Sequence, residues 1–170
     1  MKQAVLASNY KTGLHSTSSN ICGESTADRQ THFGLTFPFT ATSLDLVLKG
    51  SFDDSTHPWW GIRNLKIYAN YGTTDDGTVV VSELAKEKSF GNEIWSTSTK
   101  GSLVKCGDNQ VFGGPPSTGA GATFSRAVSG LGSHSFVTIK LKTFWIDTMD
   151  INDSVIFYLD DKIIHEQGKN

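Results

Sequence analysis

The sequence predicts an all-β protein, an antiparallel β-sandwich of the jelly-roll kind. First, apolar side chains alternate with polar ones in several short runs, which is typical of strands with one buried face. Second, turn residues separate these runs about every eight to twelve residues, as they do in sandwiches. Third, the chain contains 17 glycines and 11% aromatic residues, and it shows no long amphipathic helical pattern.

The length of 170 residues fits one domain that spans residues 1–170. Within it we expect two loop-rich β halves, at 1–70 and 90–170, which a connector at 71–89 joins. In this connector, segment 79–88 fits either a strand, because it opens with a run of valines, or a short helix of one or two turns.

The first half opens with an expected short strand at 2–10 and a polar loop at 11–31. Alternating apolar residues then predict three strands, at 32–39, 44–49 and 59–70. A turn at 51–58 carries Asp53 and Asp54.

The second half contains the most regular pattern in the chain. Short strands are expected at 94–95, 103–104 and 122–128, and the region 107–121, rich in glycine and proline, is expected to be irregular surface. Val137, Ile139 and Leu141 then alternate with polar residues in a longer strand. A strand at 155–159, a turn and a short return strand at 163–165 follow. Between the two longer strands lies an acidic loop with Asp147, Asp150 and Asp153.

Charge and motifs exclude several functions. The net charge is −2 and Lys and Arg are scattered singly, without a basic stripe, so we expect no nucleic-acid binding. No run of about 18 apolar residues exists, so we expect no membrane insertion. The first residues have too short an apolar run for a signal peptide. The histidines lack metal-site spacing and no nucleophile or phosphate-loop motif occurs, so we do not expect an enzyme.

The two cysteines, Cys22 and Cys106, lie far apart and fit no metal-ligand spacing. They form either one disulfide or two free thiols. A disulfide would indicate an oxidising compartment.

Three pieces of the chain resemble Ca²⁺-binding β-sandwich modules of secreted and surface proteins of ciliates and other protists. They are Cys106-Gly107 with Gly113-Gly114, then Phe144-Trp145-Ile146-Asp147 leading from His134-Ser135 to Asp150, and DDSTHPWWGIRN from Asp53 to Asn64. The last piece is similar to an acidic D-E-S-W-G-I-D-N ending. It departs from that ending at His57-Pro58 and at Arg63, where the modules have acids.

The order of these pieces differs from that in the modules, where the Trp-Gly-Ile strand closes the domain. Three explanations remain open. The chain is a circular permutation with 71–93 as the new connection, or it spans halves of two neighbouring modules whose subunits exchange strands. In the third explanation, the chain is a β-sandwich of a different kind whose sequence has diverged.

Carboxylates on loops between strands suit Ca²⁺, a hard cation that takes six to eight oxygen ligands. Asp147, Asp150 and Asp153 are the candidate ligands, with Asp53 or Asp54 bridging from the other half. The loop lacks the glycine and glutamate of an EF-hand. The alternative is that these aspartates only form solvated turns.

A sugar-binding site is the other candidate, because aromatic rings stack on sugars and polar side chains bind hydroxyls. Trp59, Trp60 and His57 are the candidate residues. Neighbouring tryptophans in a strand point to opposite faces, so one is expected in the core and the other exposed, with Trp60 as the residue on which binding depends.

The sequence and the resemblance together suggest a protein of the extracellular space or cell surface with a structural or adhesive role. The expected partners are further copies or neighbouring modules of the same kind, as in a filament. Glycans are the expected partners if the protein is a carbohydrate-binding module instead.

Overall fold

The computed structural model describes residues 9–16, 22, 28–52, 59–71, 77–83, 95–97, 103–106, 109–114, 118, 121–147 and 152–168. All the regular structure in these ranges is β-strand, in twelve strands. None of the described residues belongs to a helix that is long and apolar enough to cross a membrane.

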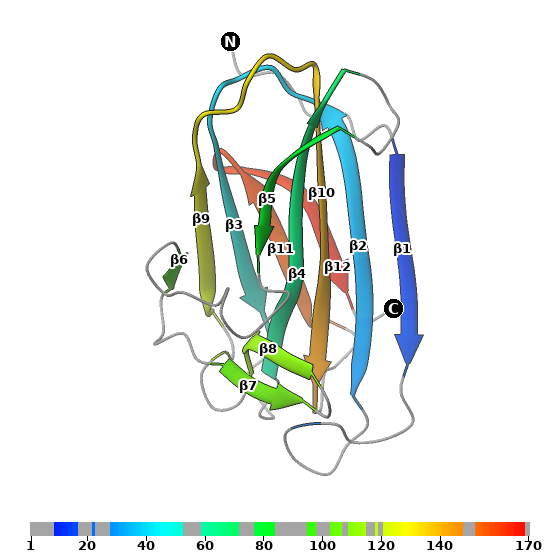
Figure 1. Cartoon of the computed structure of the whole chain (residues 1–170). Helices are drawn as coiled ribbons and strands as arrows, with labels where there is room; N and C mark the ends of the chain where they lie inside the picture. Colours follow the sequence, from blue (N-terminus) through cyan, green and yellow to red (C-terminus); the bar gives the residue numbers. More distant parts are fainter. Residues whose placement is uncertain are drawn as a thin grey trace.

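The strands form two antiparallel sheets that pack face to face (Figure 1). The first, sheet A, has the order β1 (Asn9–Ser16), β2 (Arg29–Pro38), β10 (Phe136–Ile146), β4 (Trp59–Asn70), β8 (Asn109–Gly113) and β7 (Leu103–Cys106), and β5 (Thr78–Glu83) also pairs with β4. The second, sheet B, has the order β12 (Lys162–Gly168), β11 (Ser154–Leu159), β3 (Leu44–Ser51), β9 (Thr123–Val128) and β6 (Trp95–Thr97). The prediction of an all-β sandwich is therefore confirmed.

The strand pairing is nested in the manner of a jelly roll. β2 pairs with β10, β3 with β9 and β4 with β8, all antiparallel, and successive pairs fall alternately in sheets A and B. Such a pattern arises when one long antiparallel hairpin is rolled up into two sheets. Strands from the expected halves 1–70 and 90–170 are therefore neighbours in both sheets.

The main core lies between the sheets and is rich in aromatic side chains. Phe33 of sheet A stacks on Phe157 of sheet B with ring centroids 4.3 Å apart. Trp60, which is fully buried, packs against Phe124 of sheet B with centroids 4.7 Å apart. These contacts cross between the layers and remove large apolar surfaces from water, so they hold the sandwich together.

A second, smaller apolar cluster lies on the outer face of sheet A. It contains Cys106, Val111, Phe144 and Ile146, against which Trp59 packs. Phe144 and Ile146 flank Trp145 in β10, which points into the main core, so these two side chains face outward. The β7–β8 hairpin supplies the cover, because Cys106 and Val111 belong to it.

Three expectations for individual segments are corrected or resolved. The region 11–31 is not all loop, because β1 ends at Ser16 and β2 begins at Arg29. The region 107–121 contains strand β8, whose Val111 and Phe112 are buried, so it is not all irregular surface. In the connector, residues 78–83 form strand β5, and the strand alternative for this segment is correct as far as Glu83.

Candidate functional site: the acidic end of the sandwich

Two crossover connections lie side by side at one end of the sandwich. In sheet A, Ile146 at the end of β10 is the register partner of Trp59 at the start of β4. In sheet B, Ser154 at the start of β11 is the partner of Ser51 at the end of β3. The strand ends from which the connections 52–58 and 147–153 leave and return are therefore neighbours, at the lower end in Figure 1 where the β3 and β10 arrows end. This end is named the acidic end.

Asp28, just before β2, is a buried carboxylate at the acidic end with 1% of its surface exposed. Its Oδ1 accepts a hydrogen bond from the backbone N–H of Asp147 at 3.1 Å, and its Oδ2 accepts one from the backbone N–H of Cys22 at 2.8 Å. Sequence reasoning missed Asp28, because it falls within the segment expected to be a polar loop. Its role depends on contacts with residues far along the chain.

The predicted acidic loop begins and ends on buried carboxylates. Asp147 follows β10 and is 7% exposed, and Asp153 precedes β11 and is 1% exposed. Asp147 has a φ of 63°, a left-handed conformation that Asp and Asn tolerate better than most residues. Carboxylates of solvated turn residues are normally exposed, so the burial of both residues argues against a simple turn.

The described carboxylates do not complete a metal site by themselves. Among the described residues, no three His, Cys, Asp or Glu side chains lie close enough together to hold a metal ion. The other predicted ligands, Asp53, Asp54 and Asp150, lie outside the described residues, as does His57. The donor set that the sequence places at this end consists of carboxylates, which suit Ca²⁺ or Mg²⁺ better than softer metals.

A disulfide lies next to the acidic end. Cys22 and Cys106 are joined, with their Cα atoms 4.5 Å apart. The bond fixes the segment before β2 to the β7–β8 hairpin, and Cys106 is fully buried in the outer cluster. The backbone N–H of Cys22 in turn binds Asp28. The disulfide and the buried carboxylate thus belong to one connected structure.

The two neighbouring tryptophans lie on opposite faces of sheet A. Trp60 is 0% exposed and faces the main core, so the prediction that it binds a sugar is wrong. Trp59 does point to the opposite face, as alternation predicts. That face is covered as well, since Trp59 is partly buried in the outer cluster. Trp145, in contrast, is in the core as its alternating position predicts.

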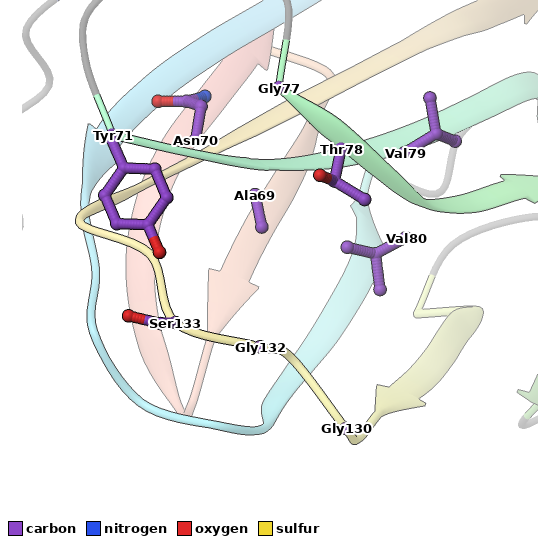
Figure 2. A pocket seen from close by; sticks show the side chains of 10 residues that line it. All are labelled: Ala69, Asn70, Tyr71, Gly77, Thr78, Val79, Val80, Gly130, Gly132 and Ser133. Carbon is purple, nitrogen blue, oxygen red and sulfur yellow. The ribbon is translucent and has the colours of Figure 1, made fainter.

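A hollow of about 630 Å³ opens at the opposite end of the sandwich. It lies between the end of β4, the start of β5 and the β9–β10 connection, and Figure 2 shows the residues that line it. Tyr71, which is 69% exposed, stands on one side, and Thr78 and Val80 lie on the other. Asn70, 5% exposed, donates from Nδ2 to Thr138, but its Oδ1 has no hydrogen-bond partner among the described residues.

Comparison of the sequence with models of known protein families finds no match, and comparison with curated proteins finds none. The possible functions therefore have to be judged from the chemistry of the two ends and of the sheet faces.

Proposed function

We propose that the protein is a calcium-stabilised β-sandwich module with a structural or adhesive role outside the cell. The observation that carries this proposal is the register at the acidic end. Ile146 pairs with Trp59 and Ser154 with Ser51, so the strand ends that lead into the loop between Asp147 and Asp153 lie beside the strand ends on either side of the segment that contains Asp53 and Asp54.

A divalent cation would add to the interactions that hold this end together. Hydrogen bonds, paired charges and bound metal ions all stabilise carboxylates that are removed from water. Asp28, Asp147 and Asp153 are all buried at or beside the acidic end. Ca²⁺ bound between the two crossovers would neutralise their charge and fix the end of the sandwich, and Asp28 would position Asp147 through its backbone N–H.

The location outside the cell is supported by the disulfide between Cys22 and Cys106, because such bonds persist in oxidising compartments. No sequence motif and no described cluster of residues suggests catalysis. A rigid, cross-linked sandwich is suited to bearing load or presenting a surface. Self-association with further copies remains the expected mode of action.

The direct test is titration of Ca²⁺ into metal-free protein by isothermal titration calorimetry, with sedimentation velocity of the same samples. We expect saturable binding of Ca²⁺ with a weaker response to Mg²⁺, which fits large oxygen cages less well. Ca²⁺-dependent growth of oligomers would support the filament role. No binding of Ca²⁺ at millimolar concentration would refute the calcium proposal.

A second candidate function, binding of a neutral glycan, is favoured by the hollow at Tyr71. An exposed aromatic side chain lies beside Ser133, Thr78 and Asn70, whose Oδ1 has no hydrogen-bond partner in the described part of the chain, and together they provide a stacking surface and polar partners for hydroxyl groups. A glycan array with wild type and Tyr71→Ala separates the candidates. Specific binding that Tyr71→Ala abolishes would establish the glycan function, and no binding to any glycan would exclude it.

A further inference from the structure

The outer face of sheet A gathers basic residues that are scattered in the sequence. Lys140 of β10 is the register partner of Lys66 in β4, and Lys142 is the partner of both Arg63 in β4 and His32 in β2. Register partners lie on the same side of an antiparallel sheet. Because Ile139 and Leu141, which alternate with the lysines, belong to the core, these basic residues face outward. They form a patch, named here the basic face, that corrects the expectation of no basic cluster: His32, Arg63, Lys66, Lys140 and Lys142.

The basic face is hollowed at its centre for two local reasons. Gly34, the register partner of Lys140 in β2, contributes no side chain. In β4 the register shifts between Lys140 and Lys142, and Asn64 in this bulge has a φ of 55°. Bulges re-aim side chains and are frequent beside functional sites. The resulting hollow measures about 430 Å³, and Lys66, Lys140 and Lys142 line it together with His32 and Asn64.

The basic face concentrates positive charge on one side of sheet A. Like charges directly opposite each other on neighbouring strands repel and destabilise the sheet, and Lys66 faces Lys140 in this way. No carboxylate is among the described residues that line the hollow. The protein as a whole carries a net charge of −2, so the basic face does not follow from a generally basic composition. A polyanion is the ligand whose charge complements such a face.

We propose that the basic face binds an acidic polysaccharide, a glycan chain that carries carboxylate or sulfate groups. A chain-like ligand is favoured because the basic residues form two neighbouring rows across the strands, Lys140 with Lys66 and Lys142 with His32 and Arg63. The three strands β2, β10 and β4 span about 10 Å at the usual strand spacing of about 4.8 Å. The Lys140 ammonium lies 5.5 Å from the centroid of the Tyr68 ring, a cation–π contact that holds it in place.

The choice of a glycan over other polyanions rests on the extracellular role proposed above, whereas the anion-binding face itself does not. Single-stranded nucleic acids are usually bound through open aromatic rings on which bases stack. The ring of Tyr68 instead holds the Lys140 ammonium against one face. A shallow, polar and cationic groove suits a hydroxylated polymer with regularly spaced anionic groups.

The test measures binding of dextran sulfate and polygalacturonate, with uncharged dextran as the neutral polymer and with poly(dT) and phosphatidylserine vesicles as the other polyanions. The variant is Lys66→Gln, Lys142→Gln. The matched control is Lys49→Gln, Lys162→Gln, which removes the same charge from sheet B. Affinities are measured at several salt concentrations, in Ca²⁺ and in EGTA, below the unfolding temperature of each sample.

We expect wild type and the control to bind at least one of the two acidic polysaccharides and not dextran. The Lys66→Gln, Lys142→Gln variant should lose about tenfold in affinity, and its slope of log affinity against log salt should fall by about two. The variant should unfold at about the same temperature as wild type, because the substituted side chains lie on the outer face and not in the core. If the protein binds only dextran sulfate, the recognised group is sulfate, and if it binds only polygalacturonate, the recognised group is carboxylate.

Three results would overturn the inference. They are absence of binding to both acidic polysaccharides at low salt, equal loss of affinity in the variant and the control, and tighter binding to poly(dT) or vesicles than to either polysaccharide. Because the basic face lies away from the acidic end, affinity for dextran sulfate at equal ionic strength should be the same in Ca²⁺ and EGTA. Failure of this inference therefore leaves the calcium proposal intact, and failure of the calcium proposal leaves the polysaccharide binding measurable.

Discussion

The backbone N–H of Asp147 donates a 3.1 Å hydrogen bond to Oδ1 of Asp28, which lies 119 residues earlier in the chain. This bond joins the end of β10 to the segment before β2. It also connects the acidic loop to the disulfide, because Oδ2 of the same carboxylate accepts the N–H of Cys22. The acidic end is thus organised around a residue that has no neighbouring motif in the sequence.

Replacing Asp28 should destabilise the protein. Asp28→Ala leaves the N–H groups of Cys22 and Asp147 without their acceptor, and a buried donor that loses its partner costs about 1–3 kcal/mol. Urea unfolding measures the difference. The control is Asp45→Ala, which removes an exposed carboxylate. Equal midpoints for the two variants would show that the Asp28 bonds do not contribute to stability.

Removing the disulfide should destabilise the protein more than replacing Asp28 does. Cys22→Ser, Cys106→Ser frees two segments that are 84 residues apart in sequence, and loss of a native disulfide typically costs about 2–5 kcal/mol. Thermal unfolding of oxidised and reduced wild type gives the same comparison without a mutation. If a reductant opens the bond, as thiol labelling would show, and the midpoint does not change, the disulfide does not stabilise the fold.

Gly61 should tolerate no side chain. A Cβ at this position would lie 2.3 Å from Cγ1 of Val111 and 3.0 Å from the backbone oxygen of Phe112. Gly61→Ala should therefore push the β7–β8 hairpin away from sheet A, at a cost of about 1–3 kcal/mol. Gly132→Ala is the matched control, since nothing lies within 4 Å of its Cβ. Equal urea unfolding midpoints for the two variants would contradict the close approach of the β7–β8 hairpin to Gly61.

Stability should fall as the pH drops below about 6.5 because of His165. Burial lowers the pKa of this histidine below its usual 6.5, and the hydrogen bond to Gln167 and the nearby Glu166 only partly oppose the effect. Below pH 6.5 the unfolded chain then binds a proton that the folded chain resists, so protonation favours unfolding. The contribution is present above pH 6.5 and is lost as the pH falls toward the pKa of the folded protein.

The measurement for His165 is urea unfolding between pH 7.5 and 5, for wild type and His165→Phe. Phenylalanine keeps an aromatic ring against Phe33 and Phe157, whose centroids lie 5.2 and 5.7 Å from the histidine ring, but it does not titrate. The variant should show a flatter dependence on pH. Parallel curves for the two proteins would assign the pH dependence to other groups.

Much of the fold could be predicted because the core-facing strands carry a strong alternating pattern. Leu44, Leu46 and Leu48 of β3 and Val137, Ile139 and Leu141 of β10 are buried as their positions predict. Strand β1, Asn9–Ser16, extends beyond the strand expected at 2–10, because it is defined by its ladder with β2, at the edge of sheet A, and not by an apolar pattern. Strand β8 was missed because it is short and lies among glycines and prolines.

The candidate sites could be predicted less well, because they depend on which strands become neighbours. Alternation correctly places Trp59 and Trp60 on opposite faces. It cannot show that the β7–β8 hairpin also covers the outer face at Trp59. Similarly, Lys66 and Lys140 lie far apart in the sequence, with strands β5 to β9 between them. Only the pairing of β4 with β10 brings them together.

The most direct test of the calcium proposal is thermal unfolding in excess Ca²⁺ and in EGTA, for wild type and for Asp147→Asn, Asp153→Asn. Asparagine keeps the shape of aspartate and also tolerates the positive φ at position 147. The control is Asp160→Asn, Asp161→Asn, which removes two exposed carboxylates from a turn with positive φ angles.

A Ca²⁺ concentration about a hundred times the Kd should stabilise the folded protein by about 2.7 kcal/mol, which corresponds to a rise of about 5–10 °C for a domain of this size. We expect this rise in wild type and in the control, and its loss in Asp147→Asn, Asp153→Asn. Identical unfolding curves of wild type in Ca²⁺ and EGTA, or an equal rise in all three proteins, would contradict a calcium site at the acidic end.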